Sequence, residues 1–374
     1  ALVGAQYALL RPDFSKTRAS ALARRDHDLA AGKPAQNVLI AMGGGDEHDA
    51  TGWVLDGLAL LAEAHDLTLH ALIGAAYPHG TTLAERAERL GARLVIHRDV
   101  WDMAALLARM DLCVGAAGTS AWERCCLGLP AINLVLADNQ RTIAAELAAA
   151  GAAADGGVFD PSTNPAQWAE RQLLPLLQAS RLSPISQATR AVTDGDGVQR
   201  VIGAAFAPAV RQSTLSLRAA RIEDAQLLHQ WQCDPRTRRF AVTQGVPAWE
   251  DHLRWFTGKL ADPKARFSIA EAGGIACGVI RLDPSRATPP PGAPQRPWRE
   301  ISILSAPEFY GCGVASRALK NLQAQHTDET LVARVLPGNI ASQRLFASAG
   351  FRPYAPELLF WDASDPHHTT TGIA

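Results

Sequence analysis

The first half of the chain alternates between short apolar runs and longer stretches rich in alanine and leucine. The apolar runs lack period-two alternation, which indicates strands that are buried on both faces of a parallel sheet. The stretches between them have the spacing of helices. This order predicts an α/β domain, Rossmann-like, over residues 1–206. The predicted strands are 37–42, 67–74, 94–97, 111–115 and 131–136.

Hydroxyl and carboxylate side chains mark the expected helix starts in this domain. Thr51, Thr81, Thr119 and Asp138 each stand where an N-cap is expected. Two further stretches, 164–178 and 185–205, have helical spacing and are predicted to close the domain. We expect a linker over 207–213.

The order of elements changes after the linker and predicts an α+β domain over 214–363. Two strands around Gly273 and Gly274 predict a hairpin, and a segment with five prolines, 287–297, predicts a loop. We expect residues 364–374 to form a disordered tail. The predicted strands are 215–218, 267–271, 275–282, 299–304 and 331–335, and the predicted helices are 222–233, 314–324 and 340–349.

Composition excludes several classes of function. The chain has 374 residues, 47% hydrophobic and 20% charged, which is typical of a globular protein. A net charge of −1 gives no support for a nucleic-acid partner, and no apolar stretch approaches the ~20 residues of a membrane span. The six cysteines lack C-x-x-C spacing, so we expect no metal, no disulfides and a cytoplasmic location. The oligomeric state is not indicated, and the opening residues lead us to expect a preceding segment.

Polar clusters follow three predicted strands of the first domain. Glycines allow close approach of a ligand, and the free amides of a helix start bind anions. In the second cluster, Thr119 and Ser120 suit a diphosphate and Glu123 suits the two hydroxyls of a ribose. A plain strand–helix turn remains the alternative for the first cluster, and simple capping for the second and third. The clusters are Gly43, Gly44, Gly45 and Asp46; 115–123; and Asp138, Asn139 and Gln140.

Residues 1–205 resemble the C-terminal half of the UDP-sugar hydrolases of pseudaminic acid biosynthesis, relatives of the GT-B glycosyltransferases. The match is carried by 7–11, 43–46, 115–119, 122–130 and 137–140. The resemblance implies that Thr119 and Ser120 bind the diphosphate of a UDP-sugar and Glu123 its ribose. It places Asn139 and Gln140 at the phosphate or sugar, and Asp49 where the family has a polar substrate contact, often an amide.

The hydrolytic base of that family lies in an N-terminal domain, on a histidine in a glycine-rich turn. Neither His48 nor His79 matches that motif, and we expect both to be surface residues. The resemblance therefore implies the nucleotide-binding half of a hydrolase without its base.

A second glycine turn, Gly311-Cys312-Gly313, follows a predicted strand and precedes a helix, an arrangement that suits a pyrophosphate. It resembles the Q/R-x-x-G-x-G/A signature of the GNAT family of N-acetyltransferases, although Tyr310 stands where Gln or Arg is usual. The spacing of Asn339, Ser342, Phe346 and the 350–351 turn matches the last helix of that family. A simple turn and a core role for Phe346 are the alternatives.

The GNAT resemblance covers about residues 214–362 and implies acetyl-CoA as co-substrate. It implies that strands around Ile303 and Val335 splay apart and hold the pantetheine between them. The residues expected to bind the co-substrate are Ile303, Leu304, Tyr310, Gly311, Cys312, Gly313, Val314, Ala315, Asn339, Ser342 and Phe346.

The acetylation chemistry has fewer signals. Glu300 is the candidate base, with a strand-end salt bridge as the alternative, and proximity of amine and thioester is a further explanation for the rate. Phe346 stands where many relatives have a tyrosine acid. Four aromatic residues could either shape an acceptor pocket or belong to the hydrophobic core: Trp231, Trp249, Trp255 and Phe256.

Together the halves predict a bifunctional nucleotide-sugar enzyme that N-acetylates a UDP-amino-sugar and also carries the UDP-binding half of the hydrolase. A tether between the two would raise the local concentration of the shared intermediate. A non-catalytic UDP-sugar-binding module and half of a GT-B glycosyltransferase are the alternatives.

Overall fold

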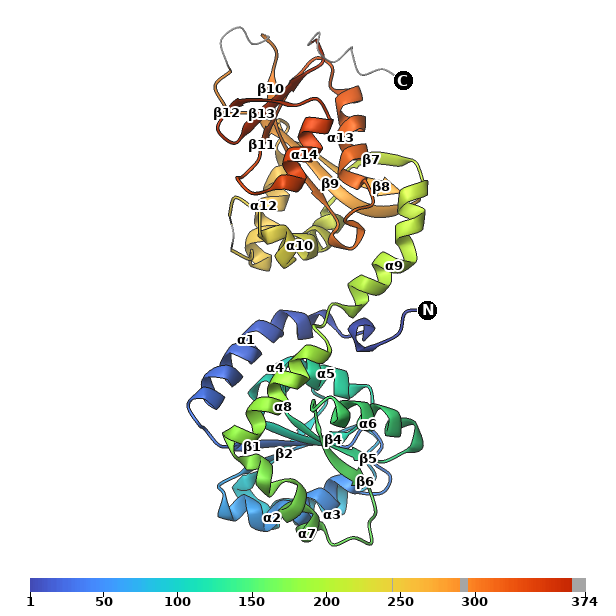
Figure 1. Ribbon diagram of the computed structural model, residues 1–374, viewed down its shortest axis with the longest axis vertical. Coiled ribbons are helices and arrows are strands. Elements are labelled where there is room, and N and C mark those ends of the chain that lie inside the picture. Colours follow the sequence, from blue (N-terminus) through green and yellow to red (C-terminus); the bar gives the residue numbers. More distant parts are fainter. Residues whose placement is uncertain (244, 290–294, 365–374) are drawn as a thin grey trace. The chain divides into compact units, whose positions relative to one another are not determined.

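The computed structural model describes residues 1–243, 245–289 and 295–364 and divides into two compact units, Ala1–Val201 and Ile202–Ala374 (Figure 1). The predicted tail beyond Ser364 and part of the proline-rich loop, 290–294, lie outside the described residues. Across the described ranges, no helix has both the length and the apolar character needed to cross a bilayer.

Unit 1 is a six-stranded sheet in the order β3-β2-β1-β4-β5-β6, with every neighbouring pair parallel. Its central strands are buried along their whole length, which confirms the parallel α/β domain that the unbroken apolar runs predict. The strands are β1 (Asn37–Ala41), β2 (Thr68–Ile73), β3 (Leu94–Arg98), β4 (Leu112–Ala116), β5 (Ala131–Val135) and β6 (Ala154–Val158).

Helices cover both faces of this sheet (Figure 1). One hydrophobic cluster joins β1, β2 and β4 to α2, α3 and α7, and a second joins them to α1, α4 and α5. The helices are α1 (Pro12–Ala30), α2 (Ala50–Ala64), α3 (Gly80–Leu90), α4 (Met103–Arg109), α5 (Ser120–Cys126), α6 (Arg141–Ala149), α7 (Pro165–Gln172) and α8 (Ala179–Val192), with 3-10 turns η1 (Ala5–Tyr7), η2 (Gly91–Arg93), η3 (Asp138–Gln140) and η4 (Leu174–Leu177).

The structure corrects the predicted N-caps. Asp49, not Thr51, caps α2 by accepting a hydrogen bond from the Gly52 amide at 3.1 Å. Thr81 lies inside α3, and Asp138 begins a 3-10 turn rather than capping a helix. Thr119 does hold the N-cap position of α5, but its side chain makes no capping hydrogen bond. Several polar residues near each start compete for the cap, and local sequence does not decide among them.

The predicted helices at the end of unit 1 are also divided differently. The stretch 164–178 forms α7 followed by η4, and 185–205 is shared between α8 and α9 (Gly197–Gln212). The segment 207–213, predicted as a linker, is helical as far as Gln212.

Unit 2 is a seven-stranded mixed sheet in the order β12-β13-β11-β10-β9-β8-β7. The hairpin predicted around Gly273 and Gly274 is present as the β8–β9 pair, and the α+β architecture is confirmed. The strands are β7 (Leu215–Ala219), β8 (Arg266–Ala272), β9 (Ile275–Pro284), β10 (Trp298–Ser305), β11 (Thr330–Arg334), β12 (Arg352–Ala355) and β13 (Leu358–Asp362).

Helices of unit 2 pack on this sheet in two groups. Helix α13 contacts β7, β9 and β10, and α12 contacts β8 and α10. Leu319 of α13 and Phe346 of α14 share a core cluster with Ile301 of β10. The helices are α10 (Ala225–Cys233), α11 (Pro235–Arg238), α12 (Trp249–Ala261), α13 (Val314–Gln325) and α14 (Ile340–Ser348), with 3-10 turns η5 (Ile222–Asp224) and η6 (Pro307–Phe309).

Candidate functional site

A cavity of about 290 Å³ opens at the carboxyl ends of β1, β2 and β4 in unit 1. Parallel sheets bind ligands at this edge, because the loops that leave the strands converge there. Most of the lining is apolar, with Asp99, Ser120, Glu123 and Arg124 as its charged or hydroxyl side chains. The lining residues are Leu39, Ala41, Gly43, Gly44, Leu72, Ile73, Gly74, Ala75, Asp99, Val100, Met103, Leu107, Cys113, Ser120, Glu123 and Arg124.

Four residues singled out from the sequence meet in this cavity: Gly43, Gly44, Ser120 and Glu123. The two glycines follow β1, while Ser120 and Glu123 begin α5. Gly74, in the loop after β2, passes so close that a Cβ there would lie 2.3 Å from the Gly44 carbonyl oxygen. Burial raises the pKa of the Glu123 carboxyl, while nearby arginines oppose the shift.

The carboxylates of Asp46 and Asp49 are used by the protein itself. Asp46 accepts hydrogen bonds from the amides of Ala50 and Thr51, both at 2.8 Å. Asp49 accepts hydrogen bonds from Tyr77 at 2.5 Å and from Arg86 at 2.7 Å. These bonds fix the start of α2 against α3. Neither aspartate, nor Gly45, belongs to the cavity lining.

Three other predicted nucleotide ligands also stand outside the lining. Thr119 and Asn139 are exposed, and the Gln140 side-chain oxygen accepts a hydrogen bond from the Leu136 amide at 3.0 Å within its own loop. Helix α5 is only seven residues long. Its start is therefore no anion site by itself.

Sequence reasoning missed the β3–α4 side of the cavity and the residue beneath it. Asp99, Val100 and Met103 follow β3 and carry no recognisable pattern, so only the fold brings them to the site. Arg124 lies in the segment 122–130, which carries part of the resemblance to the hydrolases, but the resemblance implies no role for this arginine. It is 3% exposed, which is unusual enough for an arginine to require an explanation.

In unit 2 the strands β10 and β11 pair in parallel only from Trp298 and Thr330 to Ile301 and Ala333. Strand β10 continues to Ser305 and pairs there only with β9, on its other side. Main-chain groups of β10 beyond Ile301 therefore have no strand partner on the β11 side. The splay that the resemblance implies around Ile303 and Val335 would begin just beyond this last pair.

The second glycine turn lies between this strand and α13. Gly311 and Gly313 have φ values of 78° and 71°, which only glycine adopts without strain. A Cβ added at either glycine would meet nothing within 4 Å among the atoms of the described chain beyond its immediate neighbours. The first backbone hydrogen bond of α13 runs from the Arg317 main-chain amide to the Gly313 carbonyl, at 3.1 Å. The amides of Val314 and Ala315 precede it and are the free donors of the helix start.

Two neighbours of this turn have distinct environments. Cys312 is buried. Tyr310 is 42% exposed, its hydroxyl lies 2.9 Å from the Thr237 hydroxyl, and the Arg236 guanidinium lies 5.3 Å from its ring centroid. Burial raises the pKa of the Tyr310 phenol. Tyr310, which stands where Gln or Arg is usual, therefore contacts two residues of α11.

The remaining predicted co-substrate residues belong to α14. The Asn339 side chain caps this helix by accepting a hydrogen bond from the Ser342 amide at 3.1 Å. Phe346 is buried against Phe351, with ring centroids 5.0 Å apart. Asn339 therefore serves as a cap and Phe346 as core. Trp231 and Phe256, considered for an acceptor pocket, are also core residues.

Glu300 lies one residue before the point where β10 and β11 part. Its side chain is 35% exposed, and the nearest Arg334 nitrogen is 3.7 Å away, longer than a normal hydrogen bond. Trp298 lies on the same face of β10, and its ring packs with Tyr354 and Phe360 at centroid distances of 5.8 and 6.1 Å. The Trp298 ring nitrogen and the Tyr354 hydroxyl are buried and have no hydrogen-bond partner among the described residues.

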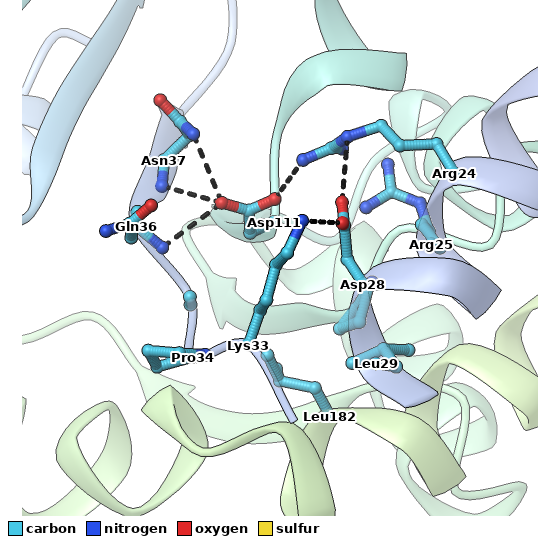
Figure 2. A pocket seen from close by; sticks show the side chains of 12 residues that line it. Arg24, Arg25, Asp28, Leu29, Lys33, Pro34, Gln36, Asn37, Asp111 and Leu182 are labelled. Carbon is cyan, nitrogen blue, oxygen red and sulfur yellow. Dashed lines mark hydrogen bonds and ion pairs between the residues drawn. The ribbon is translucent and has the colours of Figure 1, made fainter. Parts of the chain in front are cut away.

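A further cavity, of about 220 Å³, lies at the opposite end of the unit 1 sheet (Figure 2). Its charges are paired internally: Asp111 accepts hydrogen bonds from Arg24 and from the Gln36 and Asn37 amides, while Lys33 and Arg24 pair with Asp28. Arg25 donates to the carbonyls of Leu107, Met110 and Leu127 at 2.5–3.1 Å. These contacts satisfy the ends of α4 and α5, so we assign this cavity a structural role.

Two known proteins are similar in sequence to this chain. A spore coat polysaccharide biosynthesis protein of Bacillus subtilis is 28% identical over 198 residues, 53% of this chain and 56% of its own length. An uncharacterized protein of Methanocaldococcus jannaschii is 23% identical over 377 residues, covering 93% of this chain and 67% of its own. The chain thus spans little more than half of the first relative.

Solved acetyltransferases are similar at low identity. An aminoglycoside acetyltransferase in complex with coenzyme A is 16% identical, with 42% of this chain and 99% of that chain covered and a TM-score of 0.35. A spermidine N-acetyltransferase from Vibrio cholerae in complex with CoA and spermine is 18% identical, with 38% and 83% covered and a TM-score of 0.33. Residues 214–352 match the acetyltransferase (GNAT) domain family. The C-terminal part of the chain is therefore a GNAT acetyltransferase domain.

Proposed function

We propose that the chain transfers the acetyl group of acetyl-CoA to the amine of a UDP-amino-sugar, and that unit 1 binds the UDP part of the same nucleotide sugar. The observation that carries the unit 1 assignment is the cavity in which Gly43, Gly44, Ser120 and Glu123 converge. Its apolar lining suits a flat base, Glu123 suits the ribose hydroxyls, and the turn before Ser120 suits a diphosphate. The similarity to a polysaccharide biosynthesis protein supports a sugar substrate.

Acetyl-CoA occupies the fork between β10 and β11 in this proposal. The β10 main chain beyond Ile301 pairs with the pantetheine as a third strand would, and the turn at Gly311 and Gly313 binds the pyrophosphate through amides. The thioester then lies near the vertex of the fork, next to Glu300. Coenzyme A supplies the activated acetyl group when bound.

The amine acceptor approaches from the face of β10 that carries Glu300 and Trp298. Glu300 takes a proton from the ammonium group, because only a neutral amine attacks a thioester. The aromatic side chains of Trp298 and Phe360 offer a surface for the sugar ring, and the Arg334 guanidinium lies beside Glu300. The departing thiolate of CoA takes up a proton as the amide forms.

Hydrolysis of the nucleotide sugar by unit 1 needs a base in addition to the UDP site. Among the described residues that line the cavity there is no histidine. This favours a binding role for unit 1. Release of UDP by the full chain would instead support the hydrolase assignment.

The proposal is tested by incubating the full chain with acetyl-CoA and a UDP-4-amino-sugar. Free CoA thiol is measured with a disulfide reagent, and the nucleotide products are separated and weighed by mass spectrometry. Acetylated UDP-sugar without UDP release supports acetyl transfer with a binding unit 1, and release of both UDP and free sugar supports the bifunctional enzyme. Sugar transferred to an added acceptor indicates a glycosyltransferase half. Thiol release that is independent of the sugar, together with no UDP binding, would reject the proposal.

A further inference from the structure

Arg124 carries a buried charge at the base of the unit 1 cavity. Its side chain lines the cavity although the residue is only 3% exposed. We propose that this guanidinium supplies the positive charge that holds the diphosphate of a nucleotide in the cavity. The inference rests on the proposed nucleotide site and assigns its source of charge.

In the part of the chain that the structure describes, the hydrogen-bond partners of this guanidinium are neutral. It donates to the Ala116 carbonyl at 3.0 Å, to the Asn133 side-chain oxygen at 2.9 Å and to the Ser120 hydroxyl at 3.3 Å. Among the described residues no carboxylate oxygen lies within the 4.0 Å of an ion pair. The Glu123 carboxyl interacts with this cation electrostatically from beyond ion-pair distance, and burial raises the pKa of that carboxyl. The buried charge is therefore only partly balanced, and an anionic ligand would balance it further.

The chain also makes room for this guanidinium directly under the candidate diphosphate turn. A Cβ on Gly115 would lie 2.9 Å from an Arg124 nitrogen and 3.1 Å from the Ala41 carbonyl oxygen, so a side chain there would press on the guanidinium in its present place. The hydrogen bonds to Ala116 and Ser120 span both ends of the turn. The main-chain amides at the start of α5 carry only partial positive charge, whereas a diphosphate carries full negative charges. In this proposal the Arg124 guanidinium supplies the remaining positive charge.

Arg25 provides a contrast within the same unit. It is also 3% exposed, but its three carbonyl partners close the ends of α4 and α5, where helix dipoles are negative. Burial nevertheless lowers the pKa of Arg25 to about 9, so these carbonyls balance its charge only in part. Arg124 differs in position, because it lines the cavity below the candidate diphosphate turn, whereas Arg25 lines the cavity at the opposite end of the sheet.

The decisive variant is Asn133→Asp. The new carboxylate keeps the size of the side chain and pairs with Arg124 at the present 2.9 Å contact. It also replaces the Asn133 amide nitrogen, which is buried and has no partner among the described residues. We expect the full chain to stay folded while its affinity for UDP falls about 10- to 100-fold, as for loss of a charged hydrogen bond. Affinity for uridine, which has no phosphate, should change less than about twofold. Both are measured by isothermal titration at fixed ionic strength.

Arg124→Met should lower UDP affinity selectively in the same way, and Arg25→Met is the matched control. Loss of Arg25 should lower the midpoint of thermal unfolding and leave the ratio of UDP to uridine affinity unchanged. A folded Asn133→Asp protein that retains the wild-type ratio would overturn the role of Arg124. Failure of the wild-type chain to bind either UDP or uridine would instead overturn the nucleotide site itself.

Discussion

The two glycine turns of this chain look alike in sequence but differ in what surrounds them. The turn after β4 leads into a helix of seven residues and has a buried arginine beneath it. The turn after β10 leads into a helix of twelve residues and adjoins a strand whose main chain is unpaired on one side. In our proposals the first turn therefore holds a diphosphate mainly through side-chain charge, and the second mainly through main-chain donors. Similar motifs can solve the same electrostatic problem in different ways.

The largest expected effect tests whether the chemistry belongs to unit 2. Glu300→Gln removes the base beside the fork, so we expect kcat for acetyl transfer to fall about 10²- to 10⁴-fold. Binding of acetyl-CoA and of UDP should be unchanged, which isothermal titration checks. Glu271→Gln is the matched control, because Glu271 is a strand carboxylate of the same unit paired with Arg218. A kcat within twofold of wild type would assign catalysis to proximity alone.

The second prediction addresses the main-chain turn. Gly313→Val places a branched side chain at φ 71°, which shifts the amides that precede Arg317. We expect acetyl-CoA affinity to fall about 100-fold, as for a misplacement of about 1 Å, and UDP affinity to stay constant. Gly274→Val is the control, because Gly274 has φ 76° in the β8–β9 hairpin and equally open surroundings. Equal losses in both variants would show a fold defect in place of a binding defect.

A smaller effect is expected at the ribose position of unit 1. Glu123→Gln should lower affinity for UDP and uridine alike by about tenfold, since both carry the ribose. Because burial raises the pKa of Glu123, its carboxyl becomes neutral at a higher pH than an ordinary glutamate. Wild-type affinity should therefore fall as pH decreases through that raised pKa, and the variant should lack this dependence. The exposed Glu170→Gln on α7 serves as control, and an identical pH profile in the Glu123 variant would contradict the assignment.

The smallest effect concerns the stability of the unit 1 sheet. His70 and His97 lie with ring nitrogens 3.0 Å apart, and His70 also meets the Asn37 side-chain oxygen at 3.2 Å. Burial lowers the pKa of both imidazoles, with Arg109 adding repulsion. The unfolded chain therefore binds protons first, and stability falls as pH drops below about 6.5.

Urea unfolding at pH 7.5 and 5.5 measures this loss, which we expect to be about 1 kcal/mol. His97→Gln should reduce the difference between the two pH values. His27→Gln, at an exposed histidine, should leave the difference unchanged. If the His97 variant shows the same difference as the wild type, the histidine pair does not cause the pH dependence.

Prediction from sequence succeeded where the hydrophobic pattern was clear. The buried strands of unit 1 and the β8–β9 hairpin follow directly from their apolar patterns. It was less successful where several polar residues competed for one role. Asp46 and Asp49, proposed as ligands, fix the start of α2, because a carboxylate next to a helix start has free amides within reach.

The sequence by itself determined the two classes of domain and the places where glycine turns follow strands, because hydrophobic period and glycine position are local properties. Only the tertiary structure decided which of those residues share a cavity, that Arg124 is buried beneath one turn without an ion-pair partner in the described chain, and that β10 outruns its pairing with β11. These facts depend on strand order and register. Contacts between distant segments create them, and no local pattern records such contacts.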